Sequence, residues 1–230
     1  MRLSISGIVF LLLGAALLGW SAGAGHVGSR IAGISAGIAF VLLGIGYMAA
    51  RPGLLCKRAS GRMHPASYAM FWPYHLMSYA SLIFFRLARV VPFQEIVPGL
   101  YLGGWLFPWE RARLRKEGIA SVLDLTCELG EASFLRDVKV YRCIPLLDGT
   151  APTRAQLQAG IDFIREQLPN GPVYVHCAMG HGRSATVVAG YLMATGAVAD
   201  LPAAVSMIRA RRPGIRLNAA QRRSVEQLKL

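Results

Sequence analysis

The first 91 residues of this 230-residue chain contain no aspartate and no glutamate. All twelve acidic residues lie between residue 92 and the C-terminus, whereas basic residues occur throughout, and the formal net charge is +13. The N-terminal part therefore has no negative side chain to balance its own eight basic residues. This asymmetry predicts a boundary near residue 91, between a region 1–91 and a region 92–230 of different character.

Cysteine is also scarce, and its spacing excludes two classes of small domain. None of the four cysteines forms a metal-ligand pair or the pattern of a disulfide-rich secreted domain. A compartment that keeps thiols reduced is expected, and no metal or cofactor is predicted. The basic residues are not interleaved with stacking aromatics, so nucleic acid is not an expected partner. The 21 arginines against four lysines, with 25 glycines, indicate a bacterial source.

Long uncharged runs dominate the N-terminal region. Residues 3–20 and 31–50 each have about the length that an α-helix needs to cross the hydrocarbon core of a bilayer. Two membrane-spanning helices joined by residues 21–30 are therefore predicted. A cleaved signal peptide is the alternative for the first run, because Arg2 precedes it and the small residues "SAGA" follow it. The length of that run and the second run directly after it favour a retained helix.

A third apolar segment, residues 66–85, suits the membrane interface better than the bilayer centre. It carries Pro73, His75 and several tyrosines, tryptophans and serines. Basic residues flank it on both sides: Arg51, Lys57, Arg58 and Arg62 before it, Arg86 and Arg89 after it. An interfacial segment keeps these basic residues on one side as flanks facing anionic lipid, whereas a spanning segment divides them. We therefore expect a multi-pass protein of the bacterial inner membrane, with residues 92–230 in the cytoplasm.

From residue 92 onward, short β-branched runs alternate with helical patterns. Strands are predicted at 99–104, 121–126, 138–146 and 172–177, and helices at 184–196, 201–213 and 217–230. A further helix begins after Thr153 as N-cap and ends before an Asn-Gly pair. This alternation predicts an α/β sandwich around a central, mostly parallel sheet, preceded by the α-helical membrane region.

The stretch "HCAMGHGRS" lies between a predicted strand and a predicted helix. At such a turn, backbone N–H groups and the helix dipole converge on one point, which lowers the pKa of a thiol such as Cys177. Gly180 and Gly182 permit close backbone approach. Arg183 offers a planar fork that matches two oxygens of a phosphate. The pattern predicts a nucleophilic cysteine beside an oxyanion site.

His176, Cys177, Gly180, Arg183 and Ser184 match the H-C-x-x-G-x-x-R-S/T signature of the cysteine-dependent phosphatases. The stretches "IVPGLYLGG", "GIASVLDLT" and "PLLDGTAP" resemble the dual-specificity branch of that family. Sulfurtransferases of the rhodanese type typically have a loop one residue shorter. The resemblance implies the dual-specificity-phosphatase fold and hydrolysis of phosphate monoesters through a phosphocysteine intermediate.

The resemblance also implies a role for each site residue. Cys177 is the nucleophile, Asp148 the general acid and base, Ser184 a donor to the sulfur, and His176 a residue that orients the loop. The phosphate is bound by Arg183 and by the backbone of the loop: Ala178, Met179, Gly180, His181 and Gly182. A second cysteine such as Cys127 can form a protective disulfide in some members of the family, although an inert buried thiol is the alternative.

Residues in and after the thiol loop bear on the substrate. Ala178 and His181 stand where inositol-lipid phosphatases of this superfamily tend to carry lysines, and "GRSAT" resembles the phosphatidylglycerophosphate phosphatases. The expected partners are membrane lipid and a phosphorylated substrate, either a phospholipid head group or a phosphoprotein at Tyr, Ser or Thr.

Three other interpretations concern different parts of the chain. A basic run can attract an anionic substrate or be a solvated helix end: Arg209, Arg211, Arg212 and Arg216. A catalytically weak pseudophosphatase that acts as a membrane-bound, phosphate-binding adaptor is the alternative function. A transporter formed by residues 1–90 is disfavoured, because no charged residue lies inside the predicted spans.

Overall fold

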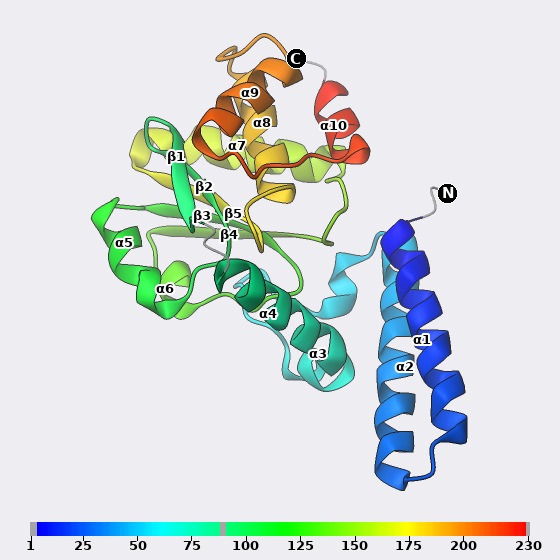
Figure 1. The fold of residues 1–230 in the computed structure, drawn as a ribbon. Helices are drawn as coiled ribbons and strands as arrows, with labels where there is room; N and C mark the ends of the chain where they lie inside the picture. Colours follow the sequence, from blue (N-terminus) through cyan, green and yellow to red (C-terminus); the bar gives the residue numbers. More distant parts are fainter. Residues whose placement is uncertain (1–3, 88–90, 229–230) are drawn as a thin grey trace.

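The computed structural model describes residues 4–87 and 91–228, so Arg2 and Arg89 of the basic flanks lie outside the described residues. A five-stranded sheet of order β1-β2-β5-β3-β4 forms the centre of the C-terminal region (Figure 1). Only β1 is antiparallel to its neighbour. The strands are β1 Phe93–Val97, β2 Leu100–Gly103, β3 Ser121–Thr126, β4 Val140–Leu146 and β5 Val173–His176. The predicted α/β fold with a mostly parallel sheet is confirmed.

Helices cover both faces of this sheet. Four of them lie together on one face (Figure 1): α7 Arg154–Gln167, α8 Arg183–Ala194, α9 Leu201–Arg211 and α10 Ala219–Glu226. The other face carries two short helices, α5 Arg111–Lys116 and α6 Ser133–Arg136. Successive strand residues point to opposite faces, so Leu123 joins the core under α7 to α10 while Val122 joins the core under α5 and α6. This explains why β3 and β5 are apolar without alternation.

Several element boundaries differ from the sequence prediction. Thr153 caps α7 and Arg183 opens α8, as predicted. The strand predicted from residue 138 begins at Val140, and the helix predicted over 217–230 begins at Ala219 and ends at Glu226. The sequence interpretation missed β1, α5 and α6, because elements of four to six residues are too short to show a hydrophobic period.

The two N-terminal apolar runs form an antiparallel pair of helices beside the α/β region (Figure 1). These are α1 Ile5–Gly23 and α2 Val27–Met48, and by length and composition both could cross a membrane. Glycines let the two backbones approach closely. A Cβ atom on Gly14 would lie 2.8 Å from the carbonyl oxygen of Gly37.

The third apolar segment forms two helices, α3 Pro65–Met70 and α4 Trp72–Leu87. One side of α4 packs on the α/β region, where Leu82 is buried beside Trp105 and Leu129. His75 is buried as well, and its ring contacts Ser67 at 3.0 Å and the backbone oxygen of Glu128 at 3.0 Å. His75 is therefore a buried residue that joins α4 to the backbone of the α/β region.

Candidate active site

Residues 177–182 connect β5 to α8 and form a loop around the Cys177 thiol. The Sγ atom accepts a hydrogen bond from the backbone N–H of Gly180 at 3.3 Å and lies 3.4 Å from the hydroxyl of Ser184. Gly180 has a φ of +71°, and a Cβ atom there would collide with the backbone of Gly103 in β2. The loop therefore needs glycine at this position for both conformation and space.

The environment of Cys177 favours the thiolate. Burial by itself would raise the pKa of this thiol, but the positive charge of Arg183 and hydrogen bonding by Ser184 outweigh it, so the pKa is lowered from its usual value. The thiol also lies at the N-terminus of α8, where the helix dipole stabilises negative charge. This arrangement makes the Cys177 thiol easier to ionise than a free thiol.

The Arg183 guanidinium is buried and held in one orientation. Its two terminal nitrogens donate to the two carboxylate oxygens of Glu128 at 2.8 and 2.6 Å, and Nη1 also donates to the backbone oxygen of Leu146 at 2.9 Å. Burial would raise the pKa of Glu128, but the charge of Arg183 outweighs it and keeps the pKa below the usual value. The bidentate pair fixes the plane of the guanidinium next to the thiol.

Asp148 reaches the same place from the loop between β4 and α7. Its Oδ1 lies 2.9 Å from Nη2 of Arg183, and its side chain is 69% exposed. The loop is anchored to the start of α10, because Asn218 donates to the backbone oxygen of Gly149 and Gln221 to that of Thr150. The structure thus brings Asp148 to Arg183 and Cys177, although it lies on a different loop of the chain.

Arg212 holds the outer side of the thiol loop. It is 3% exposed, and it donates to the backbone oxygens of Met179 at 2.9 Å and Gly180 at 2.8 Å. The interpretation of Arg212 as part of a solvated or substrate-attracting run is therefore wrong. Its hydrogen bonds keep two carbonyl groups on the side of the loop away from the thiol, which leaves the inner side for an anion.

Comparison with known proteins covers the region that contains this loop. Residues 100–229, more than half of the chain, match the family model described as dual specificity phosphatase, catalytic domain. The chain belongs to the dual specificity phosphatase family. Dual specificity protein phosphatase 26 of Rattus norvegicus is 38% identical over 109 residues, which cover 43% of this chain and 50% of that protein. Mpk3 of Drosophila melanogaster is 35% identical over 128 residues, 54% of this chain and 31% of that protein.

The solved structures that resemble this dual specificity phosphatase cover the same region. Tk-PTP in its active form is 26% identical with a TM-score of 0.53 and covers 60% of this chain and 95% of its own. PTPMT1 is 25% identical with a TM-score of 0.52 and covers 59% of this chain and 92% of its own. A further structure shows PTPMT1 in complex with PI(5)P. The chain spans about half the length of the curated relatives it matches, and helices α1 to α4 lie outside the family model.

Within the phosphatase domain, His176 lies in a buried cluster of charged groups beneath the thiol loop. Its Nε2 is 2.9 Å from a carboxylate oxygen of Glu131 and 4.0 Å from one of Asp124, and its Nδ1 is 3.3 Å from the backbone oxygen of Cys177. Burial would lower the pKa of His176, but the charge of Glu131 outweighs it and the pKa is raised. His176 therefore contacts the backbone of Cys177 and not the space in front of its sulfur.

The positively charged group of this cluster is Lys57, which lies before residues 100–229 that match the family. The Lys57 ammonium is 1% exposed and lies 2.5 Å from Oδ2 of Asp124 and 2.6 Å from the hydroxyl of Thr126. Lys57 is therefore not a flank that faces lipid, and that expectation is wrong. Asp124, Glu131 and His176 have the mutual distances of a metal-binding group, and Lys57 supplies positive charge beside it.

Three residues that support the site were not predicted from the sequence: Lys57, Glu128 and Arg212. Glu128 and Lys57 each pair with a group more than fifty positions away, and Arg212 resembles its exposed arginine neighbours. Cys127 is buried, and burial followed by the nearby charge of Glu128 raises the pKa of its thiol. All four cysteines are free in this structure, and a disulfide between Cys127 and Cys177 stays a prediction.

Proposed function

We propose that this chain is a membrane-anchored, cysteine-dependent phosphatase that hydrolyses phosphate monoesters through a phosphocysteine intermediate. The observation that supports it most is the convergence of a thiol of lowered pKa, a fixed arginine and a carboxyl group. Cys177 and Arg183 come from the loop before α8 and from its first turn, and Asp148 joins them from the loop between β4 and α7. Cleavage of an anionic ester uses all three groups: the thiolate as nucleophile, the arginine to bind the anion and the carboxyl group to protonate the leaving oxygen.

In the first step, the Cys177 thiolate attacks phosphorus and the bond from phosphorus to the alcohol oxygen breaks. Asp148, in its protonated form, gives its proton to the departing oxygen. The guanidinium of Arg183 and the backbone N–H groups of residues 178–182 bind the three remaining oxygens, whose charge is redistributed in the transition state. Glu128 and Arg212 position these donors without touching the substrate.

In the second step, water attacks the phosphocysteine. Asp148, now a carboxylate, accepts a proton from that water, and the phosphorus–sulfur bond breaks to release phosphate and the thiolate. Ser184 lies 3.4 Å from the sulfur and donates a hydrogen bond to it as negative charge returns. His176 orients the loop through the backbone of Cys177, which agrees with its position below the loop.

The substrate is a phospholipid head group or a phosphoprotein, and the protein acts at a membrane surface. The resemblance to PTPMT1 supports a lipid, and the family as a whole supports a phosphoprotein. Exposed basic residues at the end of the helix pair near the catalytic domain favour a cytoplasmic position for that domain: Arg51, Arg58 and Arg62.

Phosphate release by the purified full-length protein in mixed micelles tests this proposal. The substrates are phosphatidylglycerophosphate, a phosphoinositide and a phosphotyrosine peptide, and the Cys177→Ser variant is the blank. We expect release from at least one substrate and none with the variant. Equal release by the variant and the wild type overturns the cysteine-dependent mechanism. No release from any of the three substrates overturns the proposal and leaves the adaptor function.

A further inference from the structure

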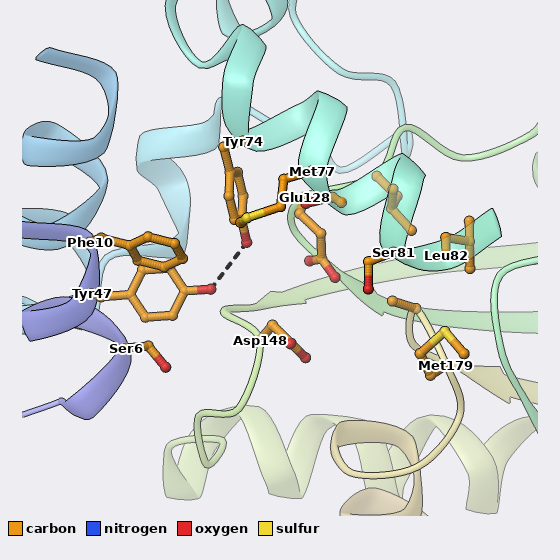
Figure 2. A pocket seen from close by; sticks show the side chains of 13 residues that line it. Ser6, Phe10, Tyr47, Tyr74, Met77, Ser81, Leu82, Glu128, Asp148 and Met179 are labelled. Atoms are coloured by element: carbon orange, nitrogen blue, oxygen red, sulfur yellow. Dashed lines mark hydrogen bonds between the residues drawn. The ribbon is translucent and has the colours of Figure 1, made fainter. Parts of the chain in front are cut away.

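A cavity of about 250 Å³ adjoins the proposed reaction centre, and its walls have two origins. The phosphatase domain contributes one wall, with Glu128, Asp148 and Met179. The helices outside the family model contribute the other, with residues of α1, α2 and α4. Figure 2 shows Asp148 at this space, between the two tyrosines of the helices on one side and Met179 of the thiol loop on the other. The site of phosphate-ester cleavage is therefore continuous with a space bounded by the membrane helices.

Three aromatic rings form the helix wall farthest from the thiol loop. The ring of Phe10 lies 5.2 Å from that of Tyr47 and 5.7 Å from that of Tyr74, measured between centroids. The hydroxyls of the two tyrosines are 3.1 Å apart and point toward each other (Figure 2). This wall is apolar in its body and has hydroxyl groups at the edge that faces the cavity, which suits a glycerol ester with acyl chains.

The helix α4 has a cavity side and an outer side. Met77, Ser78 and Ser81 line the cavity. The outer side exposes large apolar residues, with Leu76 at 63% and Ile83 at 47%. Exposed apolar area of this kind marks a surface that contacts lipid or protein. Because α4 lies beside a helix pair long enough to span a bilayer, we assign that surface to the membrane.

The outer surface of α1 is also apolar and lies next to the same cavity. Ile5 is 80% and Val9 53% exposed, while Ser6 and Phe10, the residues that follow them, line the cavity. The cavity is thus bounded by two elements whose outer sides are apolar. A molecule that occupies it can have its phosphate at Cys177 and its apolar part in the bilayer.

We propose that this cavity binds the glycerol backbone and the first acyl carbons of a membrane lipid whose head group carries a terminal phosphate monoester. This inference rests on the proposed phosphatase function and selects its substrate class. A phosphoprotein fits this wall less well than a lipid does, because the aromatic rings and apolar side chains offer few hydrogen-bond partners to a polar polypeptide backbone. A lipid presents acyl and glycerol groups there, and it is already concentrated in the bilayer that the helices occupy.

Cavity-filling substitutions on two separate walls test this assignment in the full-length protein in micelles. Ser81→Phe fills the cavity from α4, and Ser6→Phe fills it from α1. Each has a matched control at an adjacent exposed residue that does not line the cavity: Ala80→Phe for the first and Ile5→Phe for the second. The measured quantity is kcat/KM for phosphatidylglycerophosphate divided by kcat/KM for p-nitrophenyl phosphate.

We expect both cavity variants to lower this ratio at least tenfold and both controls to leave it within twofold of the wild type. The assignment is wrong if the cavity variants and controls have the same ratio while the wild type hydrolyses both substrates. It is also wrong if a phosphotyrosine peptide replaces the lipid as the preferred substrate and loses kcat/KM in the cavity variants. If the wild type hydrolyses nothing, the proposed function itself fails, which is a distinguishable result.

Discussion

Replacing Lys57 by methionine removes the cation from the buried cluster beneath the thiol loop. The Lys57 ammonium is 1% exposed and the Asp124 carboxylate is fully buried, so solvent does not screen their contact. Methionine fills a similar volume but leaves the carboxylate without its cation. Thr126 and Tyr141 still donate hydrogen bonds to Asp124 at 2.8 and 2.6 Å, which limits the loss.

Breaking a buried ion pair by removing one partner costs about 3 to 5 kcal/mol. In a chain of this size, each kcal/mol lowers the melting temperature by about 2 to 4 °C, so we expect a decrease of about 6 to 20 °C at neutral pH. Burial tends to raise the pKa of Asp124, and the charge of Lys57 is the main opposing influence that keeps it low. In the variant, Asp124 takes up a proton as the pH falls, so the difference from wild type shrinks toward pH 4.

Thermal unfolding of the full-length protein in detergent, followed by tryptophan fluorescence, measures this effect. Arg58→Met is the matched control, because it removes the same charge from the adjacent exposed residue and should change the melting temperature by less than about 2 °C. Equal decreases in the two variants would refute the reasoning, as would a Lys57→Met decrease that is the same at pH 4 and pH 7.

Three further predictions concern the reaction centre. Asp148→Asn should lower kcat for an alkyl phosphate by about 10² to 10⁴ in steady-state assays. It should lower kcat for p-nitrophenyl phosphate less, because p-nitrophenolate leaves without a proton. Equal losses for the two substrates would contradict a role of Asp148 as general acid. Glu128→Gln removes one charged acceptor of Arg183, worth about 1.5 to 3 kcal/mol, and should lower kcat/KM about 10- to 150-fold; unchanged kinetics would contradict its positioning role. The rate at which iodoacetamide alkylates Cys177 should rise with pH with a midpoint below about 8.5, the value of a free thiol. Ser184→Ala should raise that midpoint. A wild-type midpoint at or above the free value would contradict the lowered pKa.

The pattern of neighbouring residues was enough to predict β5 and α8, the strand and the helix on either side of the Cys177 loop. The apolar run that ends at His176, the glycines after Cys177 and the arginine that opens a helix are adjacent in sequence, so their meaning depends on strand and helix geometry alone. The two N-terminal helices follow from length and composition in the same way. Where a signal is contained in ten to twenty neighbouring residues, the sequence predicts the structure.

Contacts between distant segments could not be predicted. Lys57 was expected to face lipid because basic residues beside apolar runs usually do, yet its partner Asp124 lies 67 positions away. His75 contacts the backbone of Glu128, 53 positions away, and the apolar pattern of residues 66–85 does not predict this contact. In both cases a polar group satisfies a buried partner on another element, and only the packing of the helices on the sheet brings the two together.

The most direct test of the account is to trap the covalent intermediate. The full-length protein is mixed in micelles with phosphatidylglycerophosphate that carries ³²P in its terminal phosphate, denatured within milliseconds and digested at alkaline pH, and the labelled peptide is sequenced. We expect covalent label on the peptide that contains Cys177, more label in Ser184→Ala because breakdown of the intermediate is slower, and none in Cys177→Ser. Phosphate release without label on Cys177, or undiminished release by Cys177→Ser, would contradict the central claim.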